Sequence, residues 1–283
     1  RANHSLGASA AASHRMSVVG SSAEARCSNQ SAPSAASDTE CPHAGAAYAF
    51  VQQPNGTWNF ELYLKSPNPD AGDLFGDQLS LDDNLAVIGA KNESSCNTNI
   101  DFDTLAESTE AVHLADNDCP SAGAAYAFRR HNGTSWDFVA YIKPPVVHAG
   151  QEFGRSLHLT SHALVVAAKD DSCQGGTHTS VQNDTDCASR GGLGSYGSAA
   201  TCCAESGAVY VLTPHTFTLG YYLVPSQPDA GVPYSRDTGA YFSGAIAAAV
   251  APPMSFTVAP AVLVAVSIRS FYSHLSLTRG RVR

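Results

Sequence analysis

The sequence predicts an all-β protein built from four-stranded antiparallel units that recur along the chain. The heptapeptide Ala-Gly-Ala-Ala-Tyr-Ala-Phe occupies residues 44–50 and again 122–128, and a looser copy occupies residues 206–212. Trp58 and Trp136 lie 78 residues apart, a spacing that two Phe-Gly pairs and two cysteines share. Several landmarks at one fixed spacing indicate a structural unit repeated in tandem.

The second unit shows its strands most clearly. Residues 46–52 are rich in β-forming side chains, and residues 58–65 alternate between apolar and polar. A Pro-Asn-Gly turn separates these two segments. Residues 75–81 and the continuous apolar run 85–90 complete the unit. We expect these four strands to pair as one antiparallel sheet that is followed by a long loop.

The other units repeat this plan less completely. The first is a half unit, in which Gly7 matches Gly76 and Cys27 matches Cys96 at a constant offset of 69 residues. The fourth unit is degenerate and lacks the tryptophan. The third unit predicts strands at residues 124–130, 136–143, 153–160 and 164–168, and the fourth predicts them at 207–213, 219–224, 231–235 and 246–250.

A four-stranded sheet of this size cannot bury both of its faces alone, so we expect consecutive sheets to stack around an axis. The prediction is a partial β-propeller of about 3.5 blades with long, disulfide-closed loops between the blades. A sandwich fits less well, because the unit holds four strands rather than seven. The division is a partial first blade (1–43), a second blade (44–118), a third blade (119–203), a degenerate fourth blade (204–252) and a tail (253–283).

The composition excludes some partners. The net charge is −9 and the basic residues are scattered, which argues against binding to a nucleic-acid backbone. The tail is uncharged up to Arg269 and then basic, a pattern that would suit membrane attachment. However, Pro252, Pro253 and Pro260 interrupt the uncharged stretch, and residues 254–268 are short for a bilayer span. We therefore favour a tail that is not inserted in a membrane.

Cysteine usage points to an oxidising, extracellular or cell-surface location. Two pairs of cysteines flank their own loops, and we predict the disulfides Cys27–Cys41 and Cys96–Cys119. In the third loop, two bonds must be chosen from three possible connectivities. We expect the two adjacent cysteines to take separate partners. The eight cysteines expected in disulfides are Cys27, Cys41, Cys96, Cys119, Cys173, Cys187, Cys202 and Cys203. Six candidate glycosylation sites begin at Asn3, Asn29, Asn55, Asn92, Asn132 and Asn183.

Short motifs in the second and third units resemble the FG-GAP repeat, the blade unit of integrin α-subunit head propellers and of many bacterial and algal surface proteins. The resemblance rests on Phe75-Gly76, on Gly89-Ala-Lys91 and on Gly123-Ala-Ala-Tyr126. It covers about residues 5–250, although Lys91 and Lys169 stand where the family has proline. It implies a propeller that recognises a protein or glycan through its rim loops.

Calcium is not expected at the usual position of the family. The connections at residues 82–84 and 160–162 are too short to wrap a cation that needs six or more oxygen ligands. Acidic pairs in the long loops, such as Asp101 with Asp103, are explained equally well as solvated charge. We therefore assign no metal or other cofactor.

We find no catalytic motif, so no catalytic residue is assigned and the ligand-binding residues stay unknown. The Gly-x-Gly-x-x-Gly sequence at residues 192–197 lies in a cysteine-rich loop and is interpreted as a linker. The sequence thus favours a non-enzymatic recognition or adhesion module at the cell surface. The alternatives are a propeller-based hydrolase or lyase that acts on polysaccharides or esters, and a structural surface-coat protein.

Overall fold

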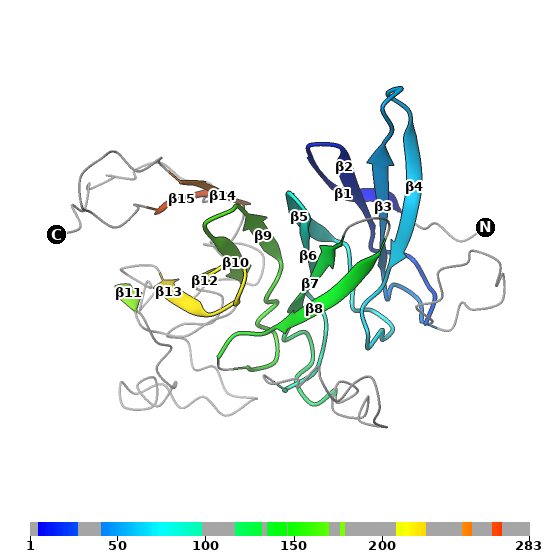
Figure 1. Cartoon of the computed structure of the whole chain (residues 1–283). Coiled ribbons are helices and arrows are strands. Elements are labelled where there is room, and N and C mark those ends of the chain that lie inside the picture. Colours follow the sequence, from blue (N-terminus) through cyan, green and yellow to red (C-terminus); the bar gives the residue numbers. More distant parts are fainter. Residues whose placement is uncertain are drawn as a thin grey trace, which may run out of the picture.

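The computed structural model describes residues 5–27, 41–97, 117–131, 135–145, 147–169 and 208–220, together with the backbone of 176–178, 221–224, 245–250 and 262–267. The described residues form an all-β structure of antiparallel sheets without a helix (Figure 1). Accordingly, no helix within these ranges has the length and apolar character needed to span a bilayer.

Three sheets follow one another along the chain. The first sheet consists of β1 (Leu6–Ser13), β2 (Met16–Ser21), β3 (Ala46–Gln52) and β4 (Trp58–Leu64). The second sheet consists of β5 (Gln78–Asp82), β6 (Leu85–Ala90), β7 (Ala124–Arg130) and β8 (Trp136–Ile142). The third sheet consists, in spatial order, of β11 (Gly176–His178), β13 (Leu219–Val224), β12 (Ala208–Leu212), β10 (Leu164–Ala168) and β9 (Ser156–Leu159). A separate hairpin joins β14 (Ala245–Val250) to β15 (Val262–Ser267).

The sheets group the strands differently from the sequence repeat. The four strands expected to pair between residues 46 and 90 are divided, because β3 and β4 close the first sheet whereas β5 and β6 open the second. The long loops after β2 and β6 therefore join neighbouring strands of one sheet, and the prediction that they lie between sheets is wrong. A turn signal in the sequence identifies a hairpin, but it does not tell which hairpins share a sheet.

Most strands lie where alternation and turn residues place them, with informative differences. The predicted strand at residues 75–81 begins only at Gln78, because Gly76 has a φ of +86° and leaves the extended conformation. The third-unit strand shortens in the same way behind Gly154. Neither β11 nor β15 was predicted, and β15 lies inside the segment assigned to the tail. The predicted strand at residues 231–235 falls outside the described ranges.

Two disulfides close the loops that enter β3 and β7. Cys27 bonds to Cys41 and Cys96 bonds to Cys119, with Cα atoms 5.2 and 5.1 Å apart. The pairing is the one predicted for cysteines that flank their own loops. Such bonds indicate an oxidising environment. The other cysteines (Cys173, Cys187, Cys202 and Cys203) lie outside the described residues.

The sheets stack face to face with their first strands adjacent. β1 contacts β5, β5 contacts β9, and β9 contacts β14, so the later strands of each sheet extend outward (Figure 1). An apolar core fills each of the two interfaces between sheets. We call the interface of the first and second sheets the first junction, and that of the second and third sheets the second junction.

A Phe-Gly connector anchors each junction. The Phe75 ring packs edge-on against Tyr126 at 5.4 Å, and Phe153 packs in the same way on Tyr210 at 5.2 Å. The amide of Phe75 donates to Ala44 O, and that of Gly76 donates to Gly89 O. The connector therefore bonds to both sheets that it joins.

Glycine is required in this connector by space as well as by conformation. A Cβ atom on Gly76 would lie 2.4 Å from the carbonyl oxygen of Ala46, and one on Gly20 would lie 2.0 Å from Gly76 O. Gly154 and Gly89 repeat this crowding at the second junction. The glycines thus let the backbones of adjacent sheets touch.

Gly76→Ala should lower the free energy of unfolding by about 3 kcal/mol or more, because it adds a backbone clash to an unfavourable φ. Gly72→Ala is the matched control, since Gly72 has a φ of +93° but no atom within 4 Å of an added Cβ. This control should cost only the conformational strain, about 1–2 kcal/mol. Denaturant unfolding of both variants measures the difference, and equal losses would contradict a role for the close backbone contact.

Candidate functional site

The two junctions differ at their outer ends, away from the first strands. At the first junction a polar cluster of Glu61, Arg130 and Trp136 fills this position. Arg130 donates to both carboxylate oxygens of Glu61, at 2.8 and 2.5 Å, and Trp136 Nε1 donates to Glu61 Oε2 at 2.9 Å. Although burial opposes its charge, these hydrogen bonds hold the pKa of Glu61 below its ordinary value. This end of the junction is closed.

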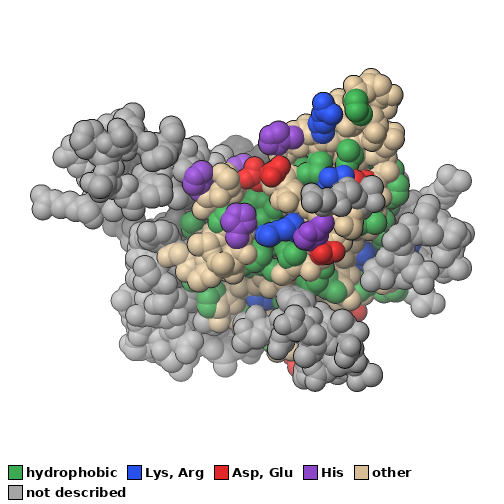
Figure 2. Space-filling model, viewed as in Figure 1, with side chains coloured by type: hydrophobic (Ala, Val, Ile, Leu, Met, Phe, Trp, Pro, Cys, Tyr) green, Lys and Arg blue, Asp and Glu red, His purple; other side chains and the backbone are tan. Residues whose placement is uncertain are grey.

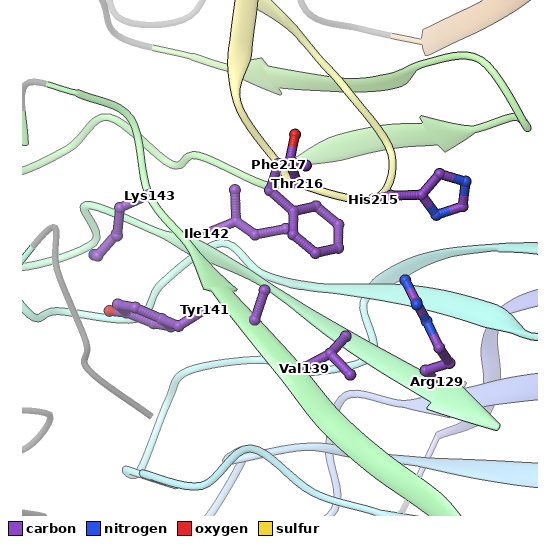
Figure 3. A pocket seen from close by; sticks show the side chains of 9 residues that line it. Arg129, Val139, Tyr141, Ile142, Lys143, His215, Thr216 and Phe217 are labelled. Carbon is purple, nitrogen blue, oxygen red and sulfur yellow. The ribbon is translucent and has the colours of Figure 1, made fainter. Parts of the chain in front are cut away.

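At the second junction the same position is open. Val139 stands where Glu61 stands one repeat earlier, Arg129 stands where Val51 stands, and the tryptophan has no counterpart. A cavity of about 440 Å³ lies there between the second sheet and the turn that joins β12 to β13. Its walls are Arg129, residues 139–143 of β8 and its end, and residues 215–217 of the turn (Figure 3).

Arg129 lines this cavity and has no counter-ion among the described residues. On β7, Tyr126 and Phe128 pack into the first junction, whereas Ala125 and Ala127 pack into the second. Strand alternation therefore directs Arg129 toward the second junction. Its Nε atom is buried and has no hydrogen-bond partner among the described residues. A buried guanidinium N–H without an acceptor is costly, so the site favours an anionic group that supplies one.

His215 adds a second nitrogen-bearing side chain to the same end. Figure 3 shows the Arg129 side chain extending toward the turn that carries His215, with the Phe217 ring beside Ile142. In Figure 2, lysine, arginine and histidine side chains lie near the middle of the drawn face, with acidic side chains among them. Arg129 and His215 make the outer end of the cavity polar.

Lys143 lines the cavity but its charge is already engaged. Its side chain is fully buried, and Nζ donates to Glu93 Oε2 at 2.5 Å and to the carbonyl oxygen of Gly123 at 2.9 Å. Tyr141 donates to the other oxygen of Glu93 at 2.7 Å. The first sheet repeats this network one unit earlier with Lys65, Glu24 and Tyr63. The recurrence identifies a structural network rather than a binding group.

A second cavity of about 380 Å³ adjoins the first, and most of the residues that line it are apolar. It shares Lys143 and Phe217 with it, and its other walls are Pro144, Pro145, Phe153, Tyr210, Leu212 and Leu219. A ligand with an acidic group and an apolar or ring-shaped body could thus use both ends. This arrangement of few polar groups beside an apolar surface is typical of ligand sites.

The residues singled out from the sequence do not line this cavity. Asn55 is exposed in the β3–β4 turn, where its Oδ1 accepts from Thr57, and Asn92 is partly buried just after β6. The other glycosylation candidates (Asn3, Asn29, Asn132 and Asn183) lie outside the described residues. So do Asp101 and Asp103. In the part of the chain that the structure describes, no group of three acidic, histidine or cysteine side chains could hold a metal ion.

A buried carboxyl group lies at the first junction. Asp73 is 3% exposed and accepts a hydrogen bond from the amide of Asp70 at 2.8 Å. Burial raises the pKa of Asp73 to about 7, and the nearby Glu93 adds to the shift. At the second junction the equivalent residue is a neutral amide, Gln151, also buried, whose Nε2 donates to the Tyr210 hydroxyl. The position therefore favours an uncharged side chain.

No model of a known protein family matches the chain, and no curated protein matches it.

Asp73→Asn should stabilise the protein increasingly as the pH rises. Because the pKa of Asp73 is higher in the folded state than its ordinary 3.8, the folded protein holds the extra proton between about pH 4 and pH 7 and loses stability across that window. The asparagine variant does not lose stability in this way, so its free energy of unfolding relative to the parent should rise by about 3–4 kcal/mol over the window. Denaturant unfolding at a series of pH values measures it, and a pH-independent difference would contradict the neutral carboxyl.

Proposed function

We propose that the protein is an extracellular or cell-surface recognition module built as a partial β-propeller of the FG-GAP type. Successive antiparallel sheets with adjacent first strands support the propeller arrangement. The Phe-Gly connectors at both junctions support the FG-GAP assignment, and the two disulfides support an oxidising location.

The ligand that this module recognises is an anionic group on a protein or glycan, bound at the second junction. The observation that carries this proposal is the change from a closed, paired cluster at the first junction to an open cavity in which Arg129 has no counter-ion among the described residues. Arginine binds carboxylates and sulfates through two parallel N–H donors, and it does so most strongly where water is partly excluded. The apolar neighbour of the cavity would contact the body of the same ligand.

Arg129→Gln should weaken binding of an acidic ligand at least about tenfold, which corresponds to 1.4 kcal/mol. Titration calorimetry with acidic oligosaccharides, acidic peptides and their neutral analogues would show which class binds. Arg15→Gln is the matched control, because it removes the same charge from an exposed residue that is far along the chain from the cavity.

Equal loss in both arginine variants would indicate binding to general surface charge and would contradict the site. Binding of neutral and acidic analogues with the same affinity would contradict the anionic ligand. Turnover of a polysaccharide or ester substrate in the same samples, lost in a variant of a cavity residue, would support the hydrolase or lyase alternative instead.

A further inference from the structure

The large apolar side chains that stay exposed in the described structure lie on one face of the first sheet. They are Leu6 on β1 and Trp58 and Phe60 on β4, with exposures of 62, 46 and 51%. Leu6 pairs with Ser21, and Phe60 pairs with Phe50. Val18, Ala47 and Ala49 pack on the opposite face, against the second sheet. We call the face with Leu6, Tyr48, Trp58 and Phe60 the outer face of the first sheet.

Each of these residues has a counterpart that is covered. Leu6 corresponds to Phe75, which is fully buried on Tyr126. Trp58 and Phe60 correspond to Trp136 and Phe138, which pack against the core of the first junction. What covers the counterparts is the first sheet itself. The structure thus contains one example of how this type of face is occupied.

The polar atoms of the outer face also lack the partners that their counterparts have. Tyr126 donates its hydroxyl to Asn68 Oδ1 at 2.8 Å, and Trp136 Nε1 donates to Glu61. The corresponding donors, Tyr48 and Trp58, make no side-chain hydrogen bond with any described residue. An occupant would need a carboxylate near Trp58 and an amide oxygen near Tyr48.

Gly7 gives a separate indication of a missing backbone neighbour. A Cβ atom added to its counterpart Gly76 would lie 2.4 Å from Ala46 O. Gly7 keeps the same conformation, with a φ of +92°, but no atom of the described residues lies within 4 Å of an added Cβ. Within the described part of the chain, nothing fills the space that a neighbouring backbone fills at the first junction.

We propose that the outer face of the first sheet is a docking surface for a further four-stranded antiparallel sheet of the same repeat. The occupant packs on this face as the first sheet packs on the second. It places a carboxylate equivalent to Glu61 near Trp58 and an amide equivalent to Asn68 near Tyr48. Gln52 occupies the position of Arg130 on this face, so the carboxylate would accept its hydrogen bonds from uncharged donors. The proposal does not depend on the ligand cavity.

The test is a chain in which residues 6–74 are duplicated in tandem ahead of Leu6, so that the added unit leads into Leu6-Gly7 as the first sheet leads into Phe75-Gly76. The chain has two tryptophans, which makes Trp58 a clean reporter. Trp136→Phe in the parent and extended chains, with Trp58→Phe in the added unit, leaves the original Trp58 alone. We expect acrylamide quenching of Trp58 to fall in the extended chain to the level of Trp136 in the Trp58→Phe parent.

A matched control carries Glu61→Ala in the added unit only, and it should restore part of the quenching. The proposal would be overturned if Trp58 stayed as accessible to acrylamide in the extended chain as in the parent. This holds whether or not the added unit folds by itself, because a face built for this sheet should order it. If the unextended chain dimerises and already shields Trp58, a second copy supplies the sheet and the proposal is supported.

A second measurement is independent of quenching. Phe60→Ser should lower the free energy of unfolding more in the extended chain than in the parent, since the ring is half exposed in the parent and buried in the proposed complex. Equal losses in both chains would show that Phe60 gains no contact and would overturn the docking surface.

Discussion

The backbone contact at each Phe-Gly connector fixes how one sheet lies on the next. At the first junction Gly20, Gly76 and the carbonyl of Ala46 approach so closely that no side chain fits between them. The amides of Phe75 and Gly76 bond to different sheets, so the connector sets spacing and register together. With this distance fixed, Phe75 reaches Tyr126 and the apolar core fills the remaining space. The same contact recurs at Gly154, which makes the stack regular.

A buried ion pair complements this contact at the base of each disulfide loop. In the second sheet Glu93 follows β6, and it accepts from Lys143 and Tyr141, which come from β8 and its end. The pair ties together the segments on either side of the loop closed by Cys96 and Cys119. Removing one partner of such a pair leaves a buried charge, which costs more than the pair itself contributes. Both sheets conserve the arrangement internally, with Glu24 and Lys65 in the first.

Local features of the structure were predictable from the sequence, whereas its long-range pairing was not. Alternation and turn residues place β3, β4 and β6 because they act within one hairpin. The assignment of β3 and β4 to one sheet and of β5 and β6 to the next depends on partners across a long loop, which no local pattern encodes. Arg129 illustrates the same limit for the cavity. It has the sequence context of an ordinary polar strand residue, and only the structure shows that it lines a cavity beside Val139, which stands at the position of the carboxylate Glu61. Aligning the repeats position by position was the signal that could have exposed this change.

Departures from an internal repeat are informative because the repeat supplies its own reference. At the second junction a paired cluster is replaced by a cavity and by an arginine with no counter-ion in the described part of the chain, so the fold is kept while the polar contacts are lost. At the outer face Tyr48, Trp58 and Phe60 keep the identity of their counterparts, and no sheet among the described residues covers them. The first kind of departure changes the chemistry of a site and suggests a ligand. The second keeps the chemistry of an interface and suggests another sheet. The two features thus lead to different proposals, since each is compared with its own counterpart in the repeat.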